Sequence, residues 1–187
     1  MDLATYVLGP LHPQRPSAEE PSLTALFTDV STTPPRTLTL NEFRDKVFRI
    51  AAGLQKRGIG KGAQVMVMSE NNLFFTAFLV GCIATGAAFI GIPMKHTSDD
   101  LAHQLSIVEP SMLLVAPQVR DTALEAQKKA GSAVDVIIYD GQLSGYTQDE
   151  KLSHWSELLE DGEAFSPPTY TAEELETNPA VLCFTSG

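Results

Sequence analysis

The stretch "LFFTAFLVGCIATGAAFIGIPM", residues 73–94, contains no charged residue and is formally long enough to span a membrane. Gly86 divides it into a helix-length part and a strand-length part, and further glycine and proline residues interrupt both. A buried helix followed by a buried parallel strand produces the same pattern. We therefore expect a helix at about 72–85, a strand at 88–92 and no membrane span.

The same alternation of helices and strands continues on both sides of this stretch. Strands of continuous apolar residues separated by helices are typical of a parallel sheet. The pattern predicts strands at 65–68, 112–116 and 134–139, helices at 99–108 and 120–130, and a last core strand at 181–184. We therefore predict an α/β fold with a doubly wound, mainly parallel sheet and flanking helices.

A helix with a clear start is predicted ahead of the first strand. Thr39 and Glu42 have the spacing of a capping box, and Gly58 is placed to end the helix. Four apolar side chains at helical spacing share one face of it: Phe43, Val47, Ile50 and Leu54. We expect this helix to pack on one side only.

Length and composition are those of one domain with a substantial core, at 187 residues and 43% hydrophobic content. We divide the chain into an extended N-terminal segment, 1–36, and an α/β portion, 37–187. The net charge is −10, and in residues 140–176 Lys151 is the one lysine or arginine. We interpret this acidic stretch as a solvated connection, with a docking site for a basic partner as the alternative. The basic stripe that nucleic acids require is missing, which argues against a nucleic-acid partner.

Both cysteines, Cys82 and Cys183, lie in apolar runs without a second cysteine or a histidine at metal-ligand spacing. We expect two buried free thiols in a reducing compartment. The four histidines form no HExxH motif or Cys/His cluster, so the residues indicate no metal site. The N-terminus lacks the pattern of a secretory signal, and we expect an intracellular location, cytoplasmic or peroxisomal.

Two further stretches contain residue types found in functional sites, but the local structure that we predict accounts for them better. The glycines of "RGIGKGAQV", 57–65, leave a helix and enter a strand, whereas a pyrophosphate loop leaves a strand and opens a helix. In "KHTSDDLAHQL", 95–105, Thr97 or Ser98 is expected to cap a helix whose first turn contains two aspartates. We predict a turn and a helix start, respectively.

The last eight residues, "AVLCFTSG", combine an apolar run with small polar residues. A strand that delivers hydroxyl and backbone N–H donors to a sheet edge can cradle a phosphate group. Tight binding would need further glycine and a lysine or arginine after Gly187, and a strand ending in an ordinary turn is the alternative. A P-loop would need G-x-x-x-x-G-K-[ST] beginning at Gly187.

Three stretches together resemble the N-terminal part of the adenylate-forming (AMP-binding) superfamily. This superfamily includes acyl-CoA synthetases, 4-coumarate-CoA ligase-like enzymes, firefly-type luciferases and peptide-synthetase adenylation domains. "LTLNEF", 38–43, is similar to the family's LTYxEL helix start. "CIATGAAFIGIPMKHTSDDLAHQL", 82–105, is similar to its xxxAGAxxxxxNPxYTxxEL element, with Ile92 where asparagine is usual. "NPAVLCFTSG", 178–187, is similar to the opening of its phosphate loop, which continues S/T-G-x-P-K-G.

The resemblance implies a two-step reaction. A small carboxylic acid reacts with ATP, assisted by Mg²⁺, to give an acyl-adenylate and pyrophosphate, and a thiol such as CoA then displaces AMP. By the family pattern, Thr185, Ser186 and Gly187 are the first residues of the loop over the β- and γ-phosphates.

The resemblance further implies that the chain is a fragment, inactive alone, with the remainder of its own enzyme as a partner. The second element is closer to the CoA-ligase and luciferase side than to peptide-synthetase adenylation domains. An adenylation domain stays open as an alternative, as does a non-catalytic binding or scaffold module with the same fold.

Overall fold

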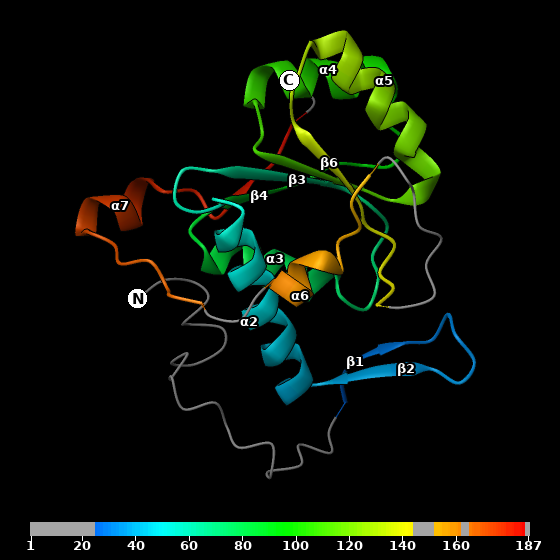
Figure 1. The fold of residues 1–187 in the computed structure, drawn as a ribbon, viewed down its shortest axis with the longest axis vertical. Coiled ribbons are helices and arrows are strands. Elements are labelled where there is room, and N and C mark those ends of the chain that lie inside the picture. Colours follow the sequence, from blue (N-terminus) through cyan, green and yellow to red (C-terminus); the bar gives the residue numbers. More distant parts are fainter. Residues whose placement is uncertain (1–24, 144–151, 162–164, 186–187) are drawn as a thin grey trace.

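The computed structural model describes residues 25–143, 152–161 and 165–185. Within these ranges, five parallel strands form the main sheet in the order β6-β5-β3-β4-β7 (Figure 1). Their bounds are β3 (Gln64–Met68), β4 (Ala88–Gly91), β5 (Met112–Val115), β6 (Asp135–Ile138) and β7 (Val181–Leu182). The predicted parallel sheet is confirmed.

Helices cover both faces of this sheet (Figure 1). One apolar core joins the first face to α2 (Leu40–Lys56), α3 (Phe75–Ala84) and α6 (Glu157–Asp161). A second core joins the other face to α4 (Ser98–Val108) and α5 (Arg120–Ala130), which follows the short helix η1 (Pro117–Val119). Because the connections from β3 and β4 pass over opposite faces, the predicted doubly wound arrangement is also confirmed.

The uncharged stretch at 73–94 forms α3 and β4, as predicted. Gly86 separates them in a turn with φ +87°, a conformation that favours glycine. Both elements are largely buried, α3 on the first face and β4 inside the sheet. No helix in the described part of the chain is long and apolar enough to cross a membrane.

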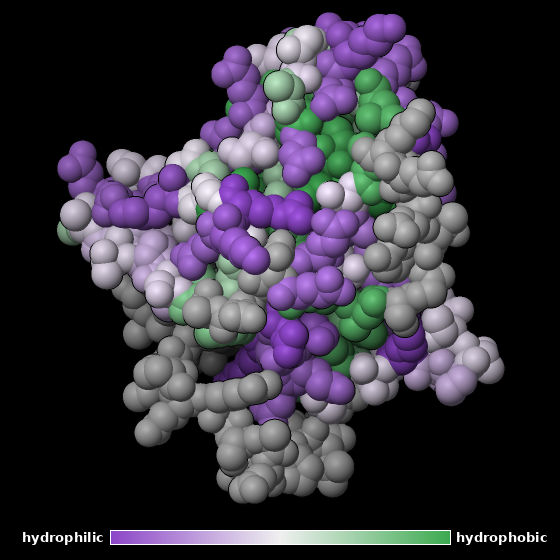
Figure 2. Space-filling view, in the orientation of Figure 1, coloured by the Kyte–Doolittle hydropathy of each residue, from purple (hydrophilic) through white to green (hydrophobic). Residues whose placement is uncertain are grey.

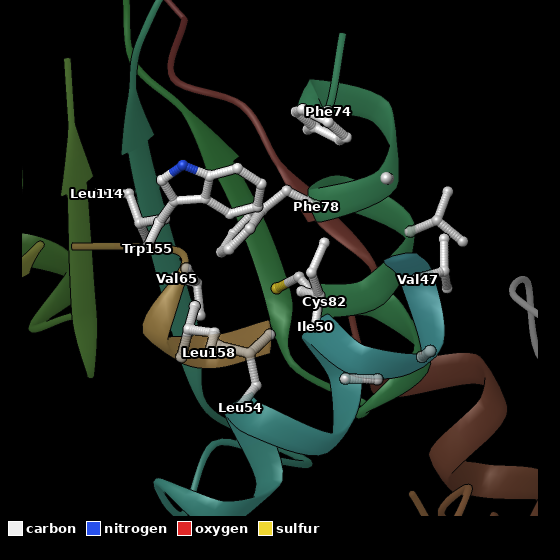
Figure 3. Close-up of a cluster of buried hydrophobic side chains, with 14 of the residues drawn as sticks. Val47, Ile50, Leu54, Val65, Phe74, Phe78, Cys82, Leu114, Trp155 and Leu158 are labelled. Carbon is white, nitrogen blue, oxygen red and sulfur yellow. The ribbon is translucent and has the colours of Figure 1, made fainter. Parts of the chain in front are cut away.

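The first predicted helix is confirmed as α2, including its start. The Thr39 hydroxyl accepts a hydrogen bond from the Glu42 N–H, and the Glu42 carboxylate accepts one from the Thr39 N–H. All four predicted core side chains of α2 are buried. Figure 3 shows Ile50 and Leu54 facing Cys82 of α3 and Leu158 of α6. The expectation that α2 packs on one side only is wrong for its second half. Residues 50–54 make more than one full turn and are all buried, because both α3 and α6 pack against this part of the helix.

A two-stranded antiparallel sheet precedes α2, and the sequence reading missed it. β1 (Ala25–Asp29) pairs with β2 (Arg36–Thr39). The two strands are also joined by an ion pair of 2.9 Å between Arg36 and Asp29. β1 falls within residues 1–36, which we expected only to be extended. The division of the chain at residue 36 stays a prediction.

Two expectations about the last strand are wrong. β7 has two residues rather than four, and it is not a core strand, because Val181 and Phe184 are 43% and 39% exposed. Cys183 is exposed as well, whereas Cys82 is buried as expected. β7 lies at one edge of the sheet, with β4 as its one strand neighbour among the described residues, and of its two residues only Leu182 packs against a core cluster. Apolar sequence alone does not reveal whether a strand has neighbours on one side or on both.

Candidate phosphate-binding edge of the sheet

Thr185 lies at the edge of the sheet where its parallel strands end. β7 pairs with β4 so that Leu182 lies beside Ile90, and the Phe89 N–H donates to the Ala180 carbonyl at 3.0 Å. The carboxyl ends of the two strands are therefore neighbours. Thr185 is exposed three residues beyond β7, on the same edge as the 92–97 loop that leaves β4.

This is the edge at which doubly wound sheets bind ligands. An exposed threonine hydroxyl can donate a hydrogen bond to a phosphate oxygen, so the described part of the predicted triplet suits an anion. Ser186 and Gly187 lie outside the described residues. Their predicted role, like that of Thr185, stays a prediction.

The start of α4 on this edge is closed by its own side chains. Thr97 is the N-cap, which decides between the two predicted candidates. Its hydroxyl accepts from the Asp100 N–H at 3.2 Å, and the Asp100 carboxylate accepts from the Thr97 N–H at 2.9 Å. The hydrogen bond from the Thr97 N–H, and after it one that the Thr97 hydroxyl donates to Asp100 Oδ2 at 2.7 Å, lower the pKa of Asp100. Because a carboxylate already occupies the helix start, this stretch is a cap, as expected, rather than an anion site.

The glycine-rich stretch at 57–65 is also structural. Gly58 and Gly62 have φ values of +77° and +81° in the turn that joins α2 to β3. This geometry confirms the expected helix end and turn.

A second polar cluster, the His154 cluster, lies at the carboxyl end of β6. His154 Nε2 is 2.9 Å from Asp140 Oδ1, and its Nδ1 is 2.8 Å from Ser156 Oγ. His154 and Ser156 are only 4% and 7% exposed. The set has the residue types of a catalytic triad, but a buried serine offers no access to a substrate. We interpret the cluster as a structural link between β6 and the segment that carries α6.

Nearby, the Tyr139 hydroxyl donates to Asn72 Oδ1 at 3.3 Å. Burial raises the pKa of Tyr139 well above its usual range, because the charged phenolate is disfavoured away from water. Asn72 Oδ1 also accepts from the Phe74 N–H at 3.0 Å at the start of α3. Sequence reading missed this contact and the His154 cluster, because the residues are far apart in the chain or look like ordinary loop positions.

Among the described residues, no group of three or more His, Cys, Asp and Glu side chains is placed to hold a metal ion.

Comparison with known proteins agrees with this architecture. Residues 14–187 match the family described as AMP-binding enzyme. The acyl-CoA ligase azaF of Aspergillus niger is 26% identical over 163 residues, which is 87% of this chain and 30% of that protein. Surfactin synthase subunit 3 of Bacillus subtilis is 26% identical over 129 residues, 64% of this chain and 10% of that protein. The chain thus spans less than a third of the length of these curated relatives.

Solved structures show the same fold at low sequence identity. A benzoate CoA ligase from Burkholderia xenovorans LB400 covers 92% of this chain with a TM-score of 0.71 and 13% identity; the matched region is 31% of that structure. MbtA from Mycobacterium smegmatis covers 81% with a TM-score of 0.65 and 24% identity, over 27% of that structure. Since the family match extends over nearly the whole chain and the fold agrees with it, the chain belongs to the AMP-binding enzyme family.

Proposed function

We propose that this chain is the N-terminal α/β part of an enzyme that uses ATP to activate a small carboxylic acid and transfers the acyl group to CoA. The observation that carries the proposal is the position of Thr185 at the carboxyl edge of the sheet, in a chain whose family match extends to Gly187. The similarity to acyl-CoA ligases supports the reaction class.

In the first step, a carboxylate oxygen of the substrate attacks the α-phosphorus of ATP. A C–O–P linkage forms, and the bond between the α-phosphorus and the bridging oxygen breaks, so that pyrophosphate leaves with the electron pair. Thr185, Ser186 and Gly187 would donate hydrogen bonds to the β- and γ-phosphates and stabilise the negative charge on the leaving group. Bound Mg²⁺ would supply further charge neutralisation.

In the second step, the thiol sulfur attacks the acyl carbon and AMP leaves. The proposal has two versions, which differ in the thiol that accepts the acyl group. CoA is the acceptor we favour, because several curated relatives are CoA ligases. The similarity to surfactin synthase subunit 3 supports the alternative of a peptide synthetase-like adenylation domain, whose acceptor is a carrier-protein thiol.

We further propose that the 187 residues are inactive alone, because the acid site and the rest of the phosphate loop would come from the remainder of the enzyme. A pyrophosphate-release assay with ATP, Mg²⁺ and mixed carboxylic acids tests this. Turnover by the isolated chain would contradict it. An intracellular location, cytoplasmic or peroxisomal, is proposed on the free thiols Cys82 and Cys183.

The experiment for the main proposal uses the full-length protein with ATP, Mg²⁺ and panels of aliphatic and aromatic acids. We expect acid-dependent AMP formation and a mass-detected thioester with CoA. A thioester that forms only on a phosphopantetheinylated carrier protein would favour the adenylation-domain alternative. Tight ATP binding in calorimetry without AMP formation from any acid would contradict the proposal and favour a binding or scaffold module.

A further inference from the structure

The helix before β7 is held to the molecule without apolar packing. α7 (Ala172–Thr177) has no buried residue, and Leu175 is 46% exposed. Figure 2 shows a mainly hydrophilic surface on the projection that carries α7 in Figure 1. Polar contacts must therefore fix its position.

Lys61, in the turn between α2 and β3, makes the main contacts with the segment that leads to β7, residues 166–178. Its Nζ donates to the Thr169 carbonyl at 3.0 Å and forms an ion pair with Glu174. The same ammonium group lies 5.4 Å from the centre of the Tyr170 ring, within the range of a cation–π contact. The hydrogen bond from Lys61 also lowers the pKa of Glu174. Lys61 thus contacts three residues of this segment: Thr169, Tyr170 and Glu174.

Two amides hold the same segment at its ends. Gln55 of α2 exchanges two hydrogen bonds with the Ser166 backbone, at 2.7 Å and 3.2 Å. Asn178 Nδ2 donates to the Gly86 carbonyl at 3.0 Å. An added Cβ at Gly86 would lie 2.7 Å from Lys61 Cγ and from the Tyr170 hydroxyl. Gly86, Lys61 and Tyr170 are therefore closely packed against one another.

The strand that follows is short, and Leu182 is its one residue that packs against the second core. β7 has two residues and is paired with β4 alone among the described strands. Its position, and that of Thr185 three residues later, must depend strongly on how α7 is held.

We propose that Lys61 is a positioning residue, which holds α7 and β7 so that the loop beginning at Thr185 meets the phosphates of ATP. The inference rests on the proposed function. Lys61 lies next to the amino end of β3, whereas Thr185 lies beyond the carboxyl end of β7, so the residue acts through the segment and not by contact with ATP.

The first test is hydrogen exchange on the full-length protein, read by mass spectrometry. In Lys61→Met we expect exchange in residues 172–185 to rise about three- to tenfold, the range for losing an exposed ion pair together with a hydrogen bond, while β3 is unchanged. Glu174→Gln keeps the capping pattern with Thr171 but removes the ion pair, so it should give part of the same effect.

Controls make this test specific. Lys61→Arg keeps the charge and should restore most of the protection. Lys128→Met removes an exposed lysine for which the described residues provide no ion pair, and it should change nothing. Unchanged exchange at β7 in Lys61→Met, or an equal rise throughout the sheet, would overturn the proposal.

The second test is the KM for ATP of the full-length protein. Lys61→Met should raise this KM severalfold with kcat within about twofold, and Lys61→Arg should reverse the change. An unchanged KM for ATP alongside altered exchange would overturn the positioning role. If the wild-type protein has no ATP-dependent activity, the proposed function fails, and the hydrogen-exchange result still decides whether Lys61 holds β7.

Discussion

Gly53 sets how closely α2 and α6 approach each other. A Cβ atom at this position would lie 2.0 Å from the Leu158 carbonyl oxygen, far inside contact distance. Gly53→Ala should therefore lower the free energy of unfolding by about 2 kcal/mol, measured by urea denaturation. Gly60→Ala is the matched control, since its Cβ would meet Thr85 at an ordinary 3.7 Å. Equal stability of the two variants would contradict this close approach.

The two thiols differ in environment and should differ in reactivity. Burial raises the pKa of Cys82 to about 12, while Cys183 is exposed beyond β7. A thiol reagent should therefore label one group per native chain and two in denaturant. Cys183→Ser should abolish the native reaction. Rapid labelling of Cys82 in the native chain would show that the first core is open.

Asp29 should make the stability of the β1–β2 hairpin depend on pH. Hydrogen bonds from Ser31 and then Arg36 lower the pKa of Asp29 from 3.8 to about 2. Since the folded-state pKa is the lower one, the stabilisation is complete above about pH 4 and is lost as the pH falls toward 2. The stability difference between wild type and Asp29→Asn should shrink over that window, followed by urea unfolding at each pH. A difference that stays constant from pH 6 to pH 3 would contradict the assignment.

At the level of single residues, local signals were predictable and tertiary ones were not. The capping pair Thr39 and Glu42 can be read from spacing alone, because both partners lie within one turn. The exposure of Cys183 and the close approach at Gly53 depend on which element lies alongside. Both properties are set by neighbours that are distant in the sequence, and a single sequence does not show which distant residues are in contact.

Whole elements were predicted well where apolar periodicity is long. The helices from α2 to α5 and the strands from β3 to β6 follow it closely. The β1–β2 hairpin and α7 were missed because their stability comes from pairing and polar contacts rather than from a long apolar pattern. β7 was predicted too long, because its apolar sequence continues beyond its hydrogen bonds to β4.

The start of α4 offers a test of an element that was predicted. Thr97→Ala removes the capping hydroxyl and should lower the free energy of unfolding by about 1 kcal/mol. Thr97→Ser keeps the hydroxyl and should retain most of the stability. Chemical denaturation followed by circular dichroism measures both. Equal loss in the two variants would show that the hydroxyl does not cap the helix.

At the level of the whole molecule, the parallel, doubly wound sheet was predictable, because buried strands alternate with helices along the chain. The strand order β6-β5-β3-β4-β7 was not, since it depends on which way each connection turns. This order places β7 beside β4, and Thr185 at the carboxyl edge of the sheet. The family match and this edge are the two observations behind the proposal of an ATP-dependent ligase.

ATP–pyrophosphate exchange by the full-length protein tests this proposal most directly. We predict exchange that requires both Mg²⁺-ATP and a carboxylic acid, and that falls about tenfold or more in Thr185→Val, which would lose the proposed hydrogen bond to charged phosphate. Because Thr185 is exposed, the variant should fold normally. Acid-dependent exchange that is unchanged in Thr185→Val, or no exchange with any acid, would contradict the account.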